Sequence, residues 1–352
     1  MITNQIDIKI YKDINDELKN SWLNLEKNGN LFIFQTYFFI NNFIKGKNGN
    51  FIFVVLSSNN KIFCILPFHV EETFGLKILQ WIGTKELDYC GPIMCDFKNF
   101  VTNEKHFEQL WDRIIKNFKN IDIIFLNKQL KTLNGCENPF AIYLNNYPFS
   151  KIYSINLNSN YENYLKEIEN KKFLNEFKRI KKKLLSENKV EFFNLDPNNN
   201  VLAIDEIISE KARYLDKKKI KHHLDDKMIQ LFKNLKKENN NFIKISVLKI
   251  NNEIIAANIG FIFQKRFYYY MPVTFSNKFN KFSPGKVLIS YLIELSVNNR
   301  LAVFDFGLGD ENYKKYWSNN TNIILRHLDY KTFKGLAFYC LAKVYSFIKK
   351  FL

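Results

Sequence analysis

The sequence predicts an α/β protein of two similar units, each a mixed, mainly antiparallel sheet flanked by helices. Three observations support this fold class. Runs of β-branched and aromatic residues alternate with Asn-rich turns, amphipathic helical segments lie between them, and the same order of elements occurs in both halves. The length of 352 residues suits two domains of ordinary size, and a hydrophobic content of 46% is enough for a core.

The first half contains a three-strand meander. Apolar runs bounded by turns predict strands at residues 51–57, 61–70 and 76–83. A loop at 84–100 then leads to an amphipathic helix at 103–118 and a strand at 121–127. Two Asn and a Pro interrupt the pattern between Asn145 and Lys151, so we expect a domain boundary there, with one domain at 1–148 and another at 149–352.

The second half repeats this order. Strands are predicted at 242–250, 254–263 and 267–275, followed by a helix at 283–299, a strand at 301–306, a short helix at 310–317 and a strand at 322–330. Two helices, at 161–190 and 201–219, precede the meander.

The helix predicted at 161–190 has two contrasting faces. Its apolar stripe is formed by Tyr164, Ile168, Phe173, Phe177, Ile180 and Leu184. Its other face carries Lys171, Lys172, Lys178, Arg179, Lys181, Lys182 and Lys183. This basic face is either solvated or faces an anion such as tRNA, lipid headgroups or a nucleotide.

The segment 332–352 predicts an amphipathic helix. Its apolar residues recur at spacings of four and three, at Phe333, Ala337, Cys340, Val344, Phe347 and Phe351. We expect this face to dock onto the protein's own core, and an interfacial membrane helix is the alternative. The sequence has no signal-peptide core and no run of about twenty apolar residues, so we expect a cytoplasmic protein, with peripheral contact at the inner membrane surface left open.

Charge and cysteine content limit the classes of function. The net charge of +17 fits either an anionic partner or a lysine-rich solvated surface. Five scattered cysteines without a C-x-x-C pair indicate a reducing compartment and no zinc knuckle. Three histidines are isolated and the other two are adjacent, so no metal site is expected. The oligomeric state cannot be predicted from these features.

The turn before the helix at 283–299 has the features of an anion site. Ser283 supplies a hydroxyl cap, Pro284 suits the first helical position, and Gly285 lets a ligand approach the backbone. Lys286 opposes the helix dipole unless an anion is bound beside it. We therefore predict that Ser283 to Lys286 bind an anionic group, and a simple helix cap is the alternative.

Five polar residues near the next strand are candidates for the chemistry. Asp305 lies at a strand end, where a carboxylate can act as a general base or can accept N–H groups of the following turn. Asp310 and Glu311 begin a short helix, and capping explains one of them. Tyr313 and Lys314 could stabilise an oxyanion or protonate a leaving group.

Several motifs together resemble a known superfamily. They are FSPGKVL at 282–288, FDFGLGDENYKKYW at 304–317, the basic KKFLNEFKRIKKKL at 171–184 and WIGTKELDYCGPI at 81–93. In these motifs the chain resembles GNAT acyltransferases, and more closely the double-GNAT CelD/BcsL-type acetyltransferases of polysaccharide biosynthesis, relatives of the FemAB-type peptidoglycan transferases.

The resemblance implies an acyl-CoA donor such as acetyl-CoA, bound at Ser283 to Lys286, and an amine or sugar acceptor on a polysaccharide or cell-envelope precursor. It also implies that residues 1–148 form a scaffold domain and residues 149–352 the catalytic domain. One departure concerns the phosphate-binding turn, because Ser283 to Lys286 contain one glycine where single-domain members have Gln/Arg-x-x-Gly-x-Gly/Ala. An aminoacyl-tRNA donor therefore stays open. A non-catalytic protein that binds RNA or an anionic membrane is a third hypothesis.

Overall fold

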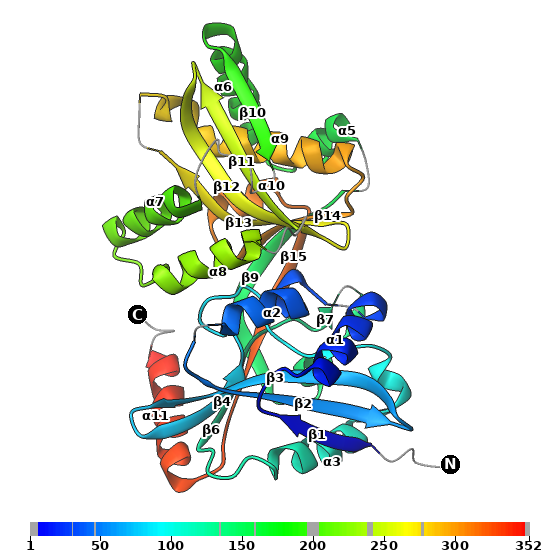
Figure 1. Cartoon of the computed structure of the whole chain (residues 1–352). Helices are drawn as coiled ribbons and strands as arrows, with labels where there is room; N and C mark the ends of the chain where they lie inside the picture. The colour runs from blue at the N-terminus through cyan, green and yellow to red at the C-terminus, as the bar shows by residue number, and fades with distance from the viewer. Residues whose placement is uncertain are drawn as a thin grey trace. The chain divides into compact units, whose positions relative to one another are not determined.

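The computed structural model describes residues 6–29, 31–45, 47–133, 135–157, 160–195, 204–237, 242–275 and 278–348, with side chains described as far as residue 342 (Figure 1). The chain forms two compact units. Unit 1 comprises residues 1–150 and 323–352, and unit 2 comprises residues 151–322.

Unit 1 is built on six paired strands in the order β1-β2-β3-β4-β6-β15. Their bounds are β1 Asp7–Tyr11, β2 Asn50–Ser58, β3 Lys61–Thr73, β4 Leu76–Trp81, β6 Ile123–Gln129 and β15 Asn320–Tyr330. The helices of this unit are α1 Asp16–Asn28, α2 Tyr37–Ile44, α3 Glu104–Ile115, α4 Pro139–Ile142 and α11 Phe333–Ile348. Short elements are β5 Ile93–Met94, β7 Thr132–Leu133, β8 Cys136–Glu137 and two 3₁₀ turns, Ile33–Gln35 and Phe97–Asn99.

Unit 2 has the equivalent strand order, β10-β11-β12-β13-β14-β9. Its strands are β9 Asn146–Asn156, β10 Val190–Leu195, β11 Ile243–Ile250, β12 Glu253–Phe263, β13 Arg266–Thr274 and β14 Val303–Leu308. Its helices are α5 Tyr161–Glu167, α6 Lys171–Glu187, α7 Ile204–Lys217, α8 Asp226–Lys237, α9 Pro284–Asn298 and α10 Asn312–Trp317, with a 3₁₀ turn at Asn280–Phe282.

The strand pairing shows that the predicted order of elements occurs in both halves. In both units a meander of antiparallel strands ends in a parallel pair, β4 with β6 and β13 with β14. The helices α3 and α9 provide the crossovers that such parallel pairs require. In each unit the last strand runs antiparallel to its neighbour. Each of these last strands comes from the chain segment that follows the other unit's meander, so the two units exchange strands. The next long strand after β6 in sequence, β9, pairs with β14 of the other unit, and β15, which follows β14, pairs with β6.

This exchange makes the observed units differ from the predicted domain limits. The boundary near residue 148 lies close to the change of unit at Ser150, but residues 323–352 group with unit 1. Asp122 holds this returning segment. Its carbonyl accepts the N–H of Lys331 at 2.9 Å, and its carboxylate accepts the hydroxyl of Thr332 at 2.5 Å.

The helix predicted at 161–190 is interrupted. It forms α5 and α6, because Asn170 caps α6 by accepting the N–H of Phe173 on its side chain at 2.9 Å. The apolar stripe still faces the core, since Tyr164, Ile168 and Phe177 are buried. One residue of the basic face turns inward, as the Lys181 ammonium donates to the Ser290 hydroxyl at 2.8 Å.

The apolar face of α11 does not dock as predicted. Phe333 is 91% exposed, and Ala337 and Cys340 are also exposed. A different side of α11 packs against unit 1. It carries Gly335, which is buried against Asp122. Of the other predicted positions, the side chains of Val344 and Phe347 and the whole of Phe351 lie outside the described residues.

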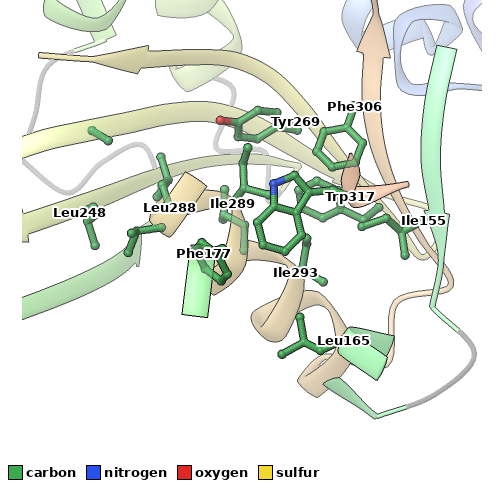
Figure 2. Packing of buried hydrophobic residues seen from close by; sticks show 14 of the residues in the cluster. Ile155, Leu165, Phe177, Leu248, Tyr269, Leu288, Ile289, Ile293, Phe306 and Trp317 are labelled. Carbon is green, nitrogen blue, oxygen red and sulfur yellow. The ribbon is translucent and has the colours of Figure 1, made fainter. Parts of the chain in front are cut away.

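The core of unit 2 is organised around Trp317, the last residue of α10 (Figure 2). The indole is fully buried and makes edge-to-face contacts with Phe173 at 5.1 Å and Phe177 at 5.0 Å between ring centroids. Tyr164 donates to the Trp317 carbonyl at 2.5 Å. Trp317 therefore locks α10 against α5, α6 and α9, and this fixes the residues that precede it.

Candidate active site

A cavity of about 580 Å³ lies within unit 2. Four elements build it: α7, the second part of β13, the turn into α9, and the segment that begins α10. Its lining includes six of the nine residues predicted as a site, namely Ser283, Pro284, Gly285, Lys286, Glu311 and Tyr313. The remaining lining residues are Glu210, Lys211, Tyr214, Tyr269, Pro272, Val273, Thr274, Asn280 and Ile289.

The cavity forms where β13 leaves its parallel neighbour. Only Arg266, Phe267 and Tyr268 of β13 pair with β14, although the strand continues to Thr274. A bulge follows at once, because Tyr269 and Met271 pair with consecutive residues of β12 and the residue between them is extra. Beyond Tyr268, β13 therefore separates from β14, and residues 269–274 of β13 are available to line a cavity.

The turn into α9 differs from the predicted cap. Pro284 is the first residue of the helix as predicted, but the Ser283 hydroxyl makes no capping bond in the described structure. Ser283 is left-handed at φ +51°, and its carbonyl accepts the N–H groups of Lys286 at 2.9 Å and Val287 at 3.3 Å. The N–H of Gly285 has no partner among the described residues, so one backbone donor of this turn is available to a ligand.

Gly285 keeps the cavity open at this turn. A Cβ atom there would lie 3.3 Å from the hydroxyl oxygen of Thr274, which is closer than ordinary contact. Lys286, one residue later, brings its ammonium to 5.4 Å from the ring centre of Phe173. The turn therefore offers one N–H group and one cation to an anionic group.

Glu311 is the predicted carboxylate that reaches the cavity. Its side chain is 56% exposed and lies 2.9 Å from the ammonium of Lys314, which is only 5% exposed. The same ammonium donates to the Leu308 carbonyl at 2.7 Å. Gly309 lies under this pair at φ +126°, where a Cβ atom would be 2.3 Å from the Glu311 carboxylate. Lys314 does not line the cavity, so its place is that of a residue that positions Glu311.

Asp305 and Asp310 lie outside the cavity lining. Asp305 is 2% exposed, forms an ion pair with Arg266 at 2.9 Å and accepts the N–H of Gly307 at 2.8 Å. These contacts match the predicted alternative in which its carboxylate stabilises the following turn. Asp310 accepts the hydroxyl of Tyr153, and this hydrogen bond raises the pKa of Tyr153 to about 12.

Two tyrosines, Tyr269 and Tyr313, line the cavity. Burial, with a contribution from the neighbouring Tyr313, raises the pKa of Tyr269 well above its ordinary value. Tyr269 therefore stays protonated at neutral pH and can donate a hydrogen bond. Tyr313 packs on Phe306 at 6.3 Å between ring centroids, which holds it beside Glu311.

Sequence reasoning missed the contribution of α7. Glu210 and Lys211 line the cavity from this helix, and the Lys211 ammonium donates to the Pro272 carbonyl at 3.2 Å. The signal was the spacing of Ile204, Ile207 and Ile208, which are buried and turn the following residues toward β13. That pattern shows which face of the helix packs, but it does not indicate which polar residues reach a cavity.

Within the described residues, no group of three or more His, Cys, Asp or Glu side chains could hold a metal ion. Nor does any helix in the described ranges have the length and apolar character needed to cross a membrane.

Part of the chain matches a known protein family. Residues 171–315 match the family described as "Acetyltransferase (GNAT) domain". These residues include α6, the meander, α9 and most of α10, and thus most of the cavity lining. No curated protein matches the sequence.

Solved structures show the same fold over nearly the whole chain. A crystal structure of FemX matches with a TM-score of 0.60 and 10% identity, covering 95% of this chain and 99% of the other. The C-terminal domain of a putative lysylphosphatidylglycerol synthetase from Agrobacterium fabrum matches with a TM-score of 0.53 and 9% identity, covering 91% and 94%. A tandem GNAT protein from the clavulanic acid biosynthesis pathway matches with a TM-score of 0.50 and 6% identity, covering 93% and 100%. The predicted fold class of two tandem GNAT-like units is thereby confirmed.

Proposed function

We propose that the cavity of unit 2 is the active site of an acyltransferase that moves an acyl group from acyl-CoA to an amine or hydroxyl. This proposal rests on one observation: groups that can bind an anion and groups that can transfer a proton line the same cavity. The turn Ser283–Lys286 supplies an N–H group and a cation, and Glu311 with Tyr313 supplies a carboxylate and a phenol. An anionic donor fits the first pair and proton transfer fits the second.

In this proposal three of the lining residues take part in the chemistry. The acceptor's nitrogen or oxygen attacks the acyl carbonyl, and the Glu311 carboxylate takes the proton that this atom loses. Tyr269 and Tyr313 are placed to donate hydrogen bonds to the developing oxyanion or to the departing thiolate. Addition gives a tetrahedral intermediate, the carbon–sulfur bond breaks as the carbonyl re-forms, and the leaving thiolate takes up a proton from Tyr269 or Tyr313, which the proton held by Glu311 replaces.

For the acceptor, we propose the class that the sequence resemblance implies, an amine or hydroxyl of a polysaccharide or cell-envelope precursor. The cavity supports a small polar acceptor, because Glu210 and Glu311 are two carboxylates on its wall and either could bind an ammonium or a hydroxyl. In this proposal unit 1 serves as a scaffold.

A FemAB-like transferase that uses aminoacyl-tRNA is the second candidate. The observation in its favour is the exposed basic face of α6. Its exposed cations are Lys171, Lys172, Lys178, Arg179, Lys182 and Lys183. The positive charge of this face is complementary to the phosphates of a nucleic-acid backbone. The turn Ser283–Lys286 has one glycine and is not specific for CoA.

Calorimetric titration can separate the two candidates. CoA, acetyl-CoA, a long-chain acyl-CoA and aminoacyl-tRNA are each titrated into the protein. If the donor is acyl-CoA, Lys286→Glu weakens its binding about fivefold or more, because a carboxylate then faces the donor's phosphates. Lys315→Glu is the matched control, since Lys315 is exposed in the same unit and does not line the cavity.

Each outcome of this titration has a defined meaning. Binding of tRNA alone, lowered by Lys178→Glu, would replace the first candidate with the second. Unchanged acyl-CoA binding in Lys286→Glu would remove Ser283–Lys286 from the donor site.

A further inference from the structure

We propose that the exposed apolar face of α11 is a docking surface for an anionic lipid bilayer. We define this docking face as Phe333, Ala337, Cys340 and Leu341. Phe333 is 91% exposed and Leu341 69% exposed, and Ala337 and Cys340 are exposed as well. These four apolar residues lie on one side of the helix and all face solvent, which is unusual for the surface of a monomeric protein.

Helix geometry places these residues together. With 100° between successive residues, the docking face spans an arc of roughly 100°, and Phe338 continues it on one flank. Phe338 is 37% exposed. The arc is as wide as the apolar stripe with which an ordinary amphipathic helix packs on a core. Here the stripe points away from the core.

The packing of α11 on unit 1 fixes this orientation. Gly335 is so close to the β6 end of the sheet that a Cβ atom would lie 2.0 Å from the carbonyl oxygen of Asp122. Tyr339 packs on Tyr330 at 5.3 Å between ring centroids. Gly335 and Tyr339 lie on the side of the helix opposite Phe333 and Ala337, so the contacts that attach α11 to unit 1 turn the docking face outward.

The positive charge of the segment that contains the docking face favours an anionic partner. Segment 331–352 contains Lys331, Lys334, Lys343, Lys349 and Lys350 and has no Asp or Glu. Among the described residues, Lys334 is exposed on this helix one position after Phe333. An apolar stripe on a basic segment is complementary to an anionic headgroup layer. A second copy of the chain is disfavoured, because a symmetric contact between two such helices would bring lysines against lysines.

The length of the helix determines the mode of contact. α11 has 16 residues, and about 20 apolar residues are needed to cross the hydrocarbon layer. The helix is therefore placed to lie in the plane of the interface, with Phe333 and Leu341 inserted among the acyl chains and Lys334 at headgroup level.

Vesicle sedimentation of the full chain tests the proposal. Vesicles of phosphatidylglycerol and phosphatidylcholine are compared with vesicles of phosphatidylcholine alone, and we expect binding to the first at low salt. The double variant Phe333→Ser/Leu341→Ser should lower the partition coefficient at least tenfold, since two large apolar side chains no longer insert. Phe74→Ser is the matched control, because Phe74 is 96% exposed in unit 1 but belongs to the turn between β3 and β4. It should bind as the unchanged protein does.

Two further measurements locate the contact. Lys334→Glu should weaken binding to anionic vesicles, whereas Lys105→Glu on the exposed side of α3 should not. A polarity-sensitive dye on Cys340, with Cys95 and Cys136 replaced by Ser, should shift its emission to the blue when phosphatidylglycerol vesicles are added.

Three results would overturn the proposal. One is equal vesicle binding by the unchanged protein and the double variant. Another is a dye on Cys340 that reports water while the protein is bound. The third is a dimer in light scattering that the double variant dissociates, without binding to either vesicle, since this would assign the docking face to a second copy.

Discussion

The Lys314 ammonium lies 2.9 Å from the carboxylate of Glu311, three residues earlier in the chain, and this ion pair positions a carboxylate that lines the cavity. The lysine is buried and is fixed through the Leu308 carbonyl, whereas the glutamate is more than half exposed. The buried cation thus holds a carboxylate that remains accessible from the cavity. This arrangement makes Glu311 the proposed base and Lys314 a positioning residue.

Replacement of Glu311 tests the proposed base. In Glu311→Gln the amide keeps the shape of the side chain but cannot take up a proton, so turnover should fall roughly 10²–10⁴-fold. Donor affinity should change little, because the donor's anionic groups are assigned to the turn at Gly285. Single-turnover transfer and calorimetry measure the two effects separately.

Glu187→Gln is the control for this variant, since Glu187 forms a surface pair with Lys183 at 3.8 Å on α6 and does not line the cavity. If Glu311→Gln retains full turnover and Glu210→Gln loses it, the base is Glu210.

Gly309→Ala should disturb the same wall without removing any charged group. The added methyl group would lie 2.3 Å from the Glu311 carboxylate and 2.9 Å from the Lys314 ammonium, in a backbone conformation that suits glycine. We expect a loss of about 1–3 kcal/mol of stability and lower turnover per folded molecule. Urea unfolding and transfer assays measure these two losses. Normal turnover in the folded variant would show that the precise position of Glu311 is unimportant.

Asp305→Asn should act on stability, not on the chemical step. The substitution leaves the Arg266 guanidinium without its carboxylate partner in a place where Asp305 is 2% and Arg266 16% exposed. Loss of one partner of a buried pair costs about 3 kcal/mol, which urea unfolding would detect. Turnover per folded molecule should stay near that of the unchanged protein. A large loss of turnover at unchanged stability would instead restore Asp305 as the base.

The sequence predicted the fold well because its signals are local. Alternating apolar runs and Asn-rich turns identify the meander strands, and Pro284 marks the start of α9. The exchange of β9 and β15 between the two units could not be predicted, because these strands pair with segments far away in the chain and no local pattern specifies such partners. The break between α5 and α6 could have been predicted from Asn170, a good capping residue three positions before Phe173.

The candidate site was predicted in part for a similar reason. The motif at 304–317 places five polar residues close in sequence, but only their packing decides which of them reach the cavity. Asp305 and Asp310 turn to Arg266 and Tyr153, whereas Glu311 faces the cavity. The partners Arg266 and Tyr153 lie 39 and 157 residues away along the chain, so no local pattern could identify them.

The last prediction concerns Glu26 of unit 1 and the dependence of stability on pH. Burial raises the pKa of Glu26 from 4.5 to about 7, although its carboxylate accepts the backbone N–H of Tyr37. Between these two pH values the folded state keeps a proton that the unfolded state releases. The free energy of unfolding should therefore decrease as the pH rises from 4.5 to about 7 and become level above that range. The full effect is roughly 3 kcal/mol.

Glu26→Gln isolates this effect, because the amide is neutral at every pH and can still accept the N–H of Tyr37. Urea unfolding of both proteins at several pH values from 5 to 8 gives the difference in their free energies of unfolding. The variant should gain on the unchanged protein as the pH rises, and the gain should stop above about pH 7. His69 and His327, whose pKa values burial lowers, titrate in both proteins and cancel in the difference. A difference that stays constant across this range would show that Glu26 is ionised in the folded protein throughout, with its charge stabilised by groups other than the Tyr37 N–H.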